Sequence, residues 1–448
     1  MLAPPSATGT GCDRSVPPES LPPGVRTWLR DRVAVGAMSG YVYDPAVALA
    51  RARALRAALP AWASLFFAVK ANGFRPVLAA LAGPGGVDGF EVASAAEART
   101  ALAVLREAGR APRLLAAGPA KTEALLQLLL DVDTEVVHVE SPLELCRLSA
   151  LAQVRGRRVQ VGLRVNPASV AVRGSLVMAG RPSPFGVPEA DVPALLDLAG
   201  TLPGIDVVGF HVHAVCGNRD AIAHAAYVGW CLDWAARTAR AGRLDLRWVD
   251  VGGGLGVAYG GEAPLDVDVL GAELARLTPP AGTEVGFEPG RWLVADCGWY
   301  AAEVVDVKEA YGTAYVVVRG GIGGFALPGT EDFPFPLTVL PVDSWPSGLP
   351  RPELRDTAVT VAGELCTPED VLVRDVLVGR VRAGDLVVVP QAGAYGWEFA
   401  LSAFLGHPPA TRDVIPSALH PTDPTGHRDQ TRPARPPALA TAALEVVP

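Results

Sequence analysis

Residues 66–72, with the sequence FFAVKAN, place a lysine at the end of an apolar, β-prone run. Such a pattern is typical of a buried strand that delivers an amine to the mouth of a pocket. Lys70 is also unusual, because only Lys70, Lys121 and Lys308 are lysines among the 39 basic residues. A desolvated lysine can lose its proton and form a Schiff base, whereas arginine stays protonated. On composition alone, an ordinary solvated lysine is the simpler interpretation.

Other side chains capable of chemistry follow further predicted strands along the chain. They are Glu91, Ser94, Asn166, His211, His213, the glycines 252–254, Glu288 and Arg291. Taken singly, each has a structural explanation: a tight turn, core histidines or a surface ion pair. Taken together, one group at each of several successive strand ends favours a functional site, because barrel enzymes carry their chemistry where strands end.

Strands and helices alternate from about residue 45 to about residue 295. Strands are predicted at 65–69, 90–94, 114–117, 136–139, 160–165, 207–213, 246–251 and 284–288. About eight such units in about 250 residues predict a parallel (β/α)8 TIM-type barrel, and a doubly wound open sheet is the competing interpretation. The run GGGLG at 252–256 lacks the spacing of a dinucleotide fingerprint.

The pattern changes after Arg291 to short β-prone runs separated by Gly, Pro and Asp, which predict a C-terminal β domain. The expected organisation has five parts. They are a disordered arm (1–24), a segment that joins the β domain (25–44), the barrel (45–295), the β domain (296–416) and a disordered tail (417–448).

Composition excludes several classes of protein. The net charge of −8 argues against a nucleic-acid binder. No long uncharged apolar segment predicts a membrane span, and the first residues lack the features of a signal peptide. The six cysteines are scattered without a CxxC pair, which favours reduced thiols, a cytoplasmic location and no metal site.

Seven ordered motifs resemble those of the fold type III pyridoxal-phosphate (PLP) decarboxylases, the family of ornithine and diaminopimelate decarboxylases. The resemblance covers about residues 35–415. The motifs are FAVKAN (67–72), GFEVAS (89–94), GFHVHAVCGN (209–218), DVGGG (250–254), EPGR (288–291), GELCTPED (363–370) and GAYG (393–396). This resemblance implies an alanine racemase-like fold, a barrel followed by a β domain.

The resemblance implies a cofactor site with PLP bound through Lys70. His213 would stack on the cofactor ring, and Glu288 would keep the pyridine nitrogen protonated, so that the ring accepts the electron pair left by CO₂. The other cofactor-binding residues that it implies are Glu91, Cys216, Gly252, Gly253, Gly254, Gly290, Arg291 and Tyr395. Glycine N–H groups can wrap a phosphate where side chains would obstruct it. Burial is expected to lower the pKa of Lys70 towards the neutral amine.

A second set of residues is implied to act on the substrate. Cys366 would donate a proton to the substrate carbon after decarboxylation, and in this family it comes from the partner subunit, which implies a homodimer with shared active sites. Arg291, Thr367 and Asp370 are the expected substrate-binding residues. Asp370 has two equally weighted roles, to bind a substrate amino group or to brace the cysteine loop.

Departures from the family pattern concern the substrate. Diaminopimelate decarboxylases carry Glu after the cysteine, whereas this chain has Thr367, and its CTPED resembles the CTPxD form of siderophore- and antibiotic-pathway decarboxylases. Cys216 stands where a phosphate-binding Ser is common, and a thiol is the poorer donor. In RGGIGG (319–324), the usual Asp before the glycine pair is absent.

The expected function is decarboxylation of an acidic amino acid attached to an acyl carrier protein. Two other enzyme interpretations are a siderophore-pathway decarboxylase of a citryl-diamino acid and a diaminopimelate-type decarboxylase. A non-enzyme interpretation, a degenerate PLP-binding regulator, predicts loss of the lysine or the cysteine. Both Lys70 and Cys366 are present.

Overall fold

The computed structural model describes residues 15–416, apart from residues 35, 171, 173, 175, 328–334 and 346. The expected disordered tail (417–448) and the first 14 residues of the expected disordered arm lie outside the described residues. Within the described part, no helix is long and apolar enough to cross a membrane.

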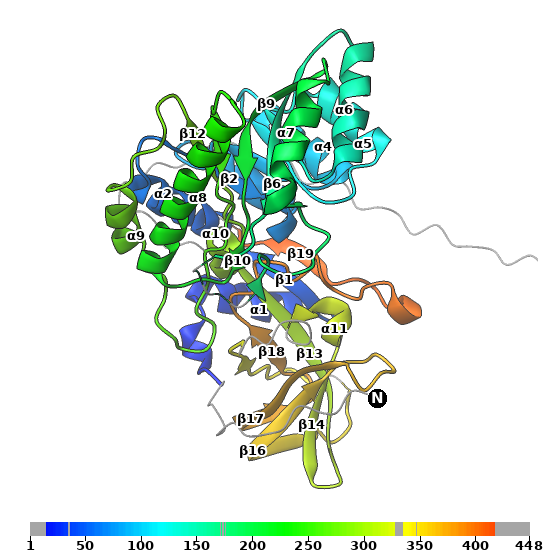
Figure 1. Cartoon of the computed structure of the whole chain (residues 1–448). Coiled ribbons are helices and arrows are strands. Elements are labelled where there is room, and N and C mark those ends of the chain that lie inside the picture. Colours follow the sequence, from blue (N-terminus) through cyan, green and yellow to red (C-terminus); the bar gives the residue numbers. More distant parts are fainter. Residues whose placement is uncertain are drawn as a thin grey trace, which may run out of the picture.

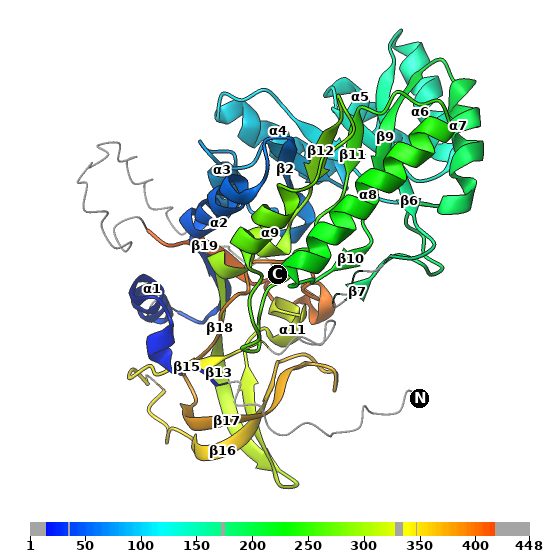
Figure 2. The ribbon, with the colours of Figure 1, turned by 60° about the vertical axis from the view of Figure 1, so that its left-hand side comes forward.

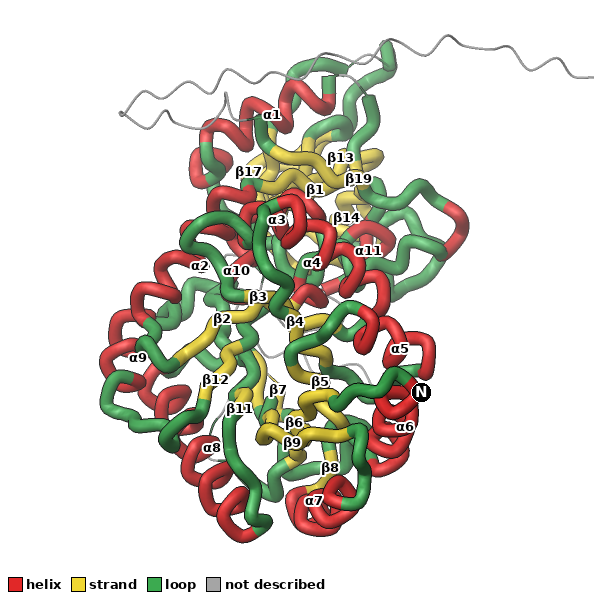
Figure 3. Tube along the Cα trace, turned by 90° about the horizontal axis from the view of Figure 1, so that it is seen from above, coloured by secondary structure: helices red, strands yellow, loops and turns green. Residues whose placement is uncertain are grey.

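Eight parallel strands close into a barrel, which Figure 3 shows end-on. Closure comes from two pairings, β12 with β2 and β5 with β6. The barrel strands are β2 (Ala63–Ala68), β3 (Gly89–Val92), β4 (Leu114–Ala116), β5 (Val136–Val139), β6 (Val159–Asn166), β9 (Ile205–His211), β11 (Trp248–Asp250) and β12 (Glu284–Phe287). The barrel prediction is confirmed, and the open-sheet interpretation is wrong.

Helices surround the barrel on its outside (Figure 3). They are α2 (Pro45–Ala58), α3 (Arg75–Leu81), α4 (Ala95–Glu107), α5 (Glu123–Asp131), α6 (Pro142–Val154), α7 (Val192–Gly200), α8 (Ala221–Ala241), α9 (Val267–Leu274) and the short α10 (Arg291–Val294). Several begin at a side chain that accepts a backbone N–H of the first turn, among them Ser94, Thr122 and Ser141. These caps fix the residue at which each of these helices begins after the preceding strand.

The second domain is an eight-stranded sheet that lies below the barrel in Figure 1. Its strands are β1 (Ser39–Tyr43), β13 (Gly298–Ala310), β14 (Thr313–Val318), β15 (Thr338–Leu340), β16 (Glu353–Ala362), β17 (Val371–Arg382), β18 (Leu386–Val389) and β19 (Thr411–Val414). β13 is central, since it pairs with β1, β14 and β18. The N-terminal strand β1 therefore belongs to the same sheet as strands from the C-terminal part of the chain.

Residues 15–24 are ordered, contrary to the disordered arm expected there. Ser15 pairs with Leu337, and a short 3-10 turn (Pro18–Ser20) leads into α1 (Pro23–Val33). Figure 2 shows α1 beside the β domain. Leu21, Val25 and Leu29 are buried there with strand residues of that domain. Val25 and Leu29, four residues apart, lie on one apolar face of α1, a signal that the Pro- and Ser-rich composition obscured.

The lysine segment is tied to the β domain by three hydrogen bonds. The backbone N–H of Tyr395 donates to the carbonyl of Ala71 at 2.7 Å. The side-chain amide of Asn72 donates to the carbonyl of Gly393 at 2.7 Å, and the N–H of Gly73 donates to Glu398 at 3.1 Å. The segment after β2 is therefore positioned by both domains.

Candidate active site

Polar side chains lie together at the carboxyl ends of the barrel strands. Lys70 follows β2, and Glu288 follows β12. Between them around the barrel lie Glu91 on β3, His138 on β5, Arg164 on β6, His211 on β9 and Asp250 on β11. Parallel strands present their carboxyl ends at one edge, so residues far apart in sequence meet there. The fold thus brings together the predicted Lys70, Glu91 and Glu288, and adds His138, Arg164 and Asp250, which sequence reasoning missed.

Lys70 forms an ion pair with Glu91. Its Nζ atom donates to Oε2 of Glu91 at 2.7 Å, and the Glu91 side chain is buried. Desolvation of the amine lowers its pKa, but the negative charges of Glu91 and Glu288 outweigh this and raise the pKa of Lys70 above its usual value. The expectation that burial would lower this pKa is wrong, because two carboxylates lie near the amine.

Glu288 and Asp250 form a coupled buried pair. Desolvation raises the pKa of both carboxyls, that of Asp250 to about 7, and each also feels the charge of neighbouring acids. Two adjacent buried carboxyls cannot both ionise readily, so the pair retains a proton in the cofactor-free protein. Oε1 of Glu288 has no hydrogen-bond partner among the described residues.

The DVGGG turn needs glycine for close approach. A Cβ atom on Gly253 would lie 2.3 Å from the carbonyl oxygen of Glu288, and one on Gly254 would lie 2.5 Å from that of Val215. Gly252 and Gly254 also have φ angles of +69° and +83°. The N–H of Gly252, however, donates to Oδ1 of Asp250 at 2.7 Å. Gly252 therefore positions this acid, and its role in binding a phosphate stays a prediction.

His213 lies against the same turn. Its Nδ1 accepts the N–H of Gly253 at 3.3 Å, and its Nε2 lies 3.2 Å from the sulfur of Cys216. Burial, followed by the charges of Lys70 and Arg164, lowers the pKa of His213 to about 3. The imidazole is therefore neutral.

Arg291 and Tyr395 stack at the boundary of the two domains. The guanidinium of Arg291 lies 4.8 Å from the centre of the Tyr395 ring, and its Nη1 donates to the hydroxyl of Tyr259 at 3.3 Å. Burial raises the pKa of Tyr395 to about 12, so its hydroxyl keeps its proton. A Cβ on Gly290 would approach that of Ala71 to 2.8 Å. Glycine at 290 therefore lets the EPGR and lysine segments lie together.

The GELCTPED loop lies between β16 and β17, and its acid braces it. Asp370 is buried, with Oδ1 accepting the N–H of Ile322 at 2.7 Å and Oδ2 accepting the N–H of Leu365 at 2.7 Å. Burial also raises the pKa of this carboxyl. Of its two expected roles, these contacts support bracing of the cysteine loop over substrate binding.

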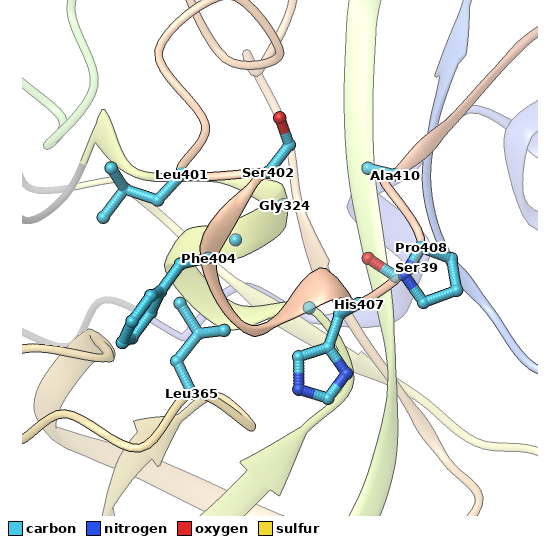
Figure 4. Close-up of a pocket in the computed structure, with 11 residues that line it drawn as sticks. Ser39, Gly324, Leu365, Leu401, Ser402, Phe404, His407, Pro408 and Ala410 are labelled. Atoms are coloured by element: carbon cyan, nitrogen blue, oxygen red, sulfur yellow. The ribbon is translucent and has the colours of Figure 1, made fainter.

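Cys366 and Thr367 are not part of the group at the barrel strand ends. Cys366 is exposed, and the half-buried Thr367 bonds through its hydroxyl to Glu369. Among the described residues, no hydrogen bond or ion pair joins either one to the barrel. Leu365, adjacent to Cys366, lines a small pocket of the β domain with Phe404 and other residues (Figure 4).

The barrel-end group suits PLP on observations of this chain. A lysine, a glycine turn that no side chain could enter, a neutral imidazole and the buried acid Glu288 surround one place. Lys70 would carry the cofactor, and Glu288 would face its ring nitrogen. When bound, PLP supplies an electron sink for the carbon that loses its carboxylate. His138, His211 and Glu288 also offer atoms within 4.8 Å of one another, a geometry that could hold a cation where none is expected.

Comparison with known proteins identifies the family. Residues 47–295 match the family model described as pyridoxal-dependent decarboxylase, pyridoxal binding domain. The chain is 32% identical over 372 residues to the 2-[(L-alanin-3-ylcarbamoyl)methyl]-2-hydroxybutanedioate decarboxylase of Staphylococcus aureus, covering 82% of this chain and 92% of that protein. It is also 32% identical over 380 residues to the L-glutamyl-[BtrI acyl-carrier protein] decarboxylase of Niallia circulans, covering 82% and 86%.

A solved structure agrees on the fold. The crystal structure of diaminopimelate decarboxylase from Helicobacter pylori in complex with L-lysine superposes with a TM-score of 0.73 at 23% identity, covering 84% of this chain and 91% of that one. The fold, the family model and the relatives therefore lead to one conclusion: this chain belongs to the PLP-dependent decarboxylases of fold type III.

Proposed function

We propose that this decarboxylase removes the α-carboxylate of an acidic amino acid whose distal carboxyl is joined to an acyl carrier protein. The observation that carries this proposal is the residue after Cys366. Thr367 offers a hydroxyl, already bonded to Glu369, where diaminopimelate decarboxylases have a carboxylate for the distal amino-acid centre. A substrate with a neutral thioester at its distal end needs no such acid.

The two relatives support a tethered substrate. One is named for a glutamyl group on a carrier protein, and the other for an alanine joined at its third carbon, through a carbamoyl group, to a hydroxybutanedioate. Both names describe an amino acid with a larger group at its distal end. Because the two identities are equal, a citryl-type conjugate is the second candidate substrate.

Each residue of the proposed active site has a separate role in the reaction. Lys70 would carry the cofactor, Glu288 would face the ring nitrogen, and His213 would pack on the ring. Arg291 offers its guanidinium to the phosphate or to the substrate carboxylate. As the bond from the α-carbon to the carboxylate breaks, CO₂ leaves and the electron pair stays with the substrate. The thiol of Cys366 then gives its proton to that carbon, and solvent reprotonates the thiolate.

Cys366 reaches a second active site in a homodimer under this proposal. Near its loop, the segment 397–406 exposes Phe399, Leu401, Phe404 and Leu405, each 45–50% exposed. The N–H of Leu401 donates to the carbonyl of Ile322 at 3.0 Å, and Ile322 is bonded to Asp370 of the cysteine loop. A second copy that covers this apolar segment would bring Cys366 with it. The scattered cysteines, without a CxxC pair, support a cytoplasmic location.

A substrate panel tests the proposed function. The protein with PLP is offered L-glutamyl and L-aspartyl carrier-protein thioesters, a citryl-diaminopropionate conjugate and free meso-diaminopimelate, and mass spectrometry follows loss of CO₂. The proposal expects turnover of an aminoacyl carrier protein. Turnover of the citryl conjugate alone would support the second candidate, and turnover of free diaminopimelate alone would contradict both.

A further inference from the structure

A buried imidazole lies behind Glu288. His138 on β5 and Trp248 on β11 are both buried, and the indole Nε1 of Trp248 lies 3.3 Å from Nε2 of His138. An indole nitrogen only donates hydrogen bonds, so Nε2 of His138 must be the unprotonated acceptor. The contact with Trp248 thus decides which ring nitrogen carries the proton.

The tautomer follows from this contact. A ring with one nitrogen that accepts a hydrogen bond is neutral and carries one proton. With Nε2 unprotonated, the single ring proton is on Nδ1. That atom lies 3.8 Å from Oε1 of Glu288, and neither atom has a hydrogen-bond partner among the described residues. Hydrogen bonds of this kind are often long until the ligand is present.

The other groups that face this ring do not compete for its proton. Oδ2 of Asp250 lies 3.7 Å from Nε2 of His138, on the side that Trp248 already fills. His211 stacks on His138 with ring centres 4.3 Å apart, and its own Nε2 lies 3.5 Å from Oε2 of Glu288. Lys121 donates to the backbone carbonyl of His138 and not to the ring.

Two glycines on neighbouring strands make room for the two rings. A Cβ atom on Gly162 of β6 would lie 2.7 Å from Cδ2 of His138. A Cβ atom on Gly286 of β12 would lie 2.7 Å from Cζ2 of Trp248. Phe66 packs its ring against Trp248 at 82°, with centres 5.9 Å apart. The side chains of His138 and Trp248 therefore fill the space that these glycines leave, and packing fixes their relative positions.

We propose that Trp248 and His138 form a positioning pair for Glu288. Trp248 holds His138 as the Nδ1–H tautomer, and His138 then donates to Oε1 of Glu288. This leaves Oε2 directed to the ring nitrogen of the cofactor. The inference rests on the assignment of Glu288 to that nitrogen. No proton is transferred, because His138 acts only by orienting the carboxyl.

The first test needs no cofactor. Long-range ¹H–¹⁵N NMR of the cofactor-free protein, with ¹⁵N-labelled histidine, reports the protonation of each ring nitrogen, and His138→Asn assigns the signal among seven histidines. We expect protonated Nδ1 and unprotonated Nε2, and we expect Trp248→Phe to remove this preference. The Nε2–H tautomer, an imidazolium or a stoichiometric metal ion bound to His138 would overturn the proposal.

The second test uses two isosteres. Asparagine at 138 places an amide nitrogen near the position of Nδ1, whereas glutamine places it near Nε2. We expect His138→Gln and Trp248→Phe to weaken PLP binding about tenfold, as loss of an outer hydrogen-bond partner commonly does. We expect His138→Asn to stay within about threefold of wild type. Trp230→Phe, away from this ring, is the control.

The two tests separate this inference from the proposed function. If the wild-type protein does not bind PLP, the assignment of Glu288 fails whatever the tautomer is. If wild type binds PLP and both isosteres bind it equally well, the positioning pair is wrong and the cofactor site stands.

Discussion

Lys70 and Glu91 form an ion pair 2.7 Å long at the ends of two neighbouring barrel strands. Because Glu91 and Glu288 both raise the pKa of Lys70, the amine is charged in the cofactor-free protein. An ammonium cannot attack an aldehyde, so cofactor attachment requires loss of this proton. Under the proposed role of Lys70, Glu91 sets the pH at which the cofactor becomes attached.

Glu91→Gln should shift the pH dependence of cofactor attachment. The substitution removes a negative charge next to Lys70, so its pKa falls and the neutral amine appears at lower pH. The rising limb of the attachment rate, followed by growth of the visible absorption band after PLP is added, should move to lower pH. Glu107→Gln, which disrupts only a surface pair with Arg75, is the control. An unchanged pH profile would show that Glu91 does not govern the amine.

Asp250→Asn should change how stability depends on pH. The pKa of Asp250 is raised to about 7 in the folded protein, so the folded state holds a proton that the unfolded chain releases near pH 4. Stability from this group is present at low pH and is lost as pH rises towards 7. Asparagine removes this loss, so the variant should gain about 2–4 kcal/mol relative to wild type between about pH 4 and pH 8.

Urea unfolding of the cofactor-free proteins at about pH 4 and about pH 8 measures this gain in the free energy of unfolding. Asp245→Asn is the control, because that side chain is 88% exposed. An Asp250→Asn difference that is the same at both pH values would contradict the shared-proton account of the buried pair.

Gly253→Ala should abolish tight PLP binding. The added Cβ would meet the carbonyl oxygen of Glu288 at 2.3 Å, so the turn must move away from the EPGR segment. We expect at least about a tenfold loss of PLP affinity and a stability loss of about 1–3 kcal/mol. Gly200→Ala, where a Cβ meets nothing within 4 Å, should leave affinity unchanged. Fluorescence titration with PLP measures the affinity of both variants, and wild-type affinity in Gly253→Ala would refute the role of the DVGGG turn in PLP binding.

Cys366→Ala should separate cofactor binding from turnover. Because the exposed thiol does not contribute to the barrel-end group, the visible band should form as in wild type. Product formation should slow about 10²–10⁴-fold, the usual range for loss of a proton donor. Cys146→Ala is the matched control. Wild-type turnover of the best substrate from the panel would show that another group donates the proton.

The alternation of strands and helices, with the order of the motifs, was enough to predict the barrel and the meeting of Lys70, Glu91 and Glu288, because strand ends in a parallel barrel must share one edge. The partners of these groups were not predictable in the same way. His138 lies in the apolar run VVHV and has the pattern of a core residue. Its contact with Trp248 spans 110 residues, and only the folded structure shows it.

Hydrogen bonds to the backbone also could not be predicted from the sequence pattern. The N–H of Gly252 is used by Asp250, two residues earlier, which spacing alone does not reveal. Asp370 braces a segment 48 residues away through Ile322. At the N-terminus, the composition of residues 15–24 indicated disorder, whereas burial of Leu21 beneath the β domain gives these residues a fixed place.

The most direct test is to locate the cofactor on the chain. The protein is incubated with PLP, reduced with borohydride and digested, and the peptide that carries the pyridoxyl group is identified by mass spectrometry. With only three lysines, Lys121 and Lys308 serve as internal controls. The account predicts modification of Lys70 alone, and none in Lys70→Ala. Modification of Lys121 or Lys308 in place of Lys70, or no adduct at all, would contradict it.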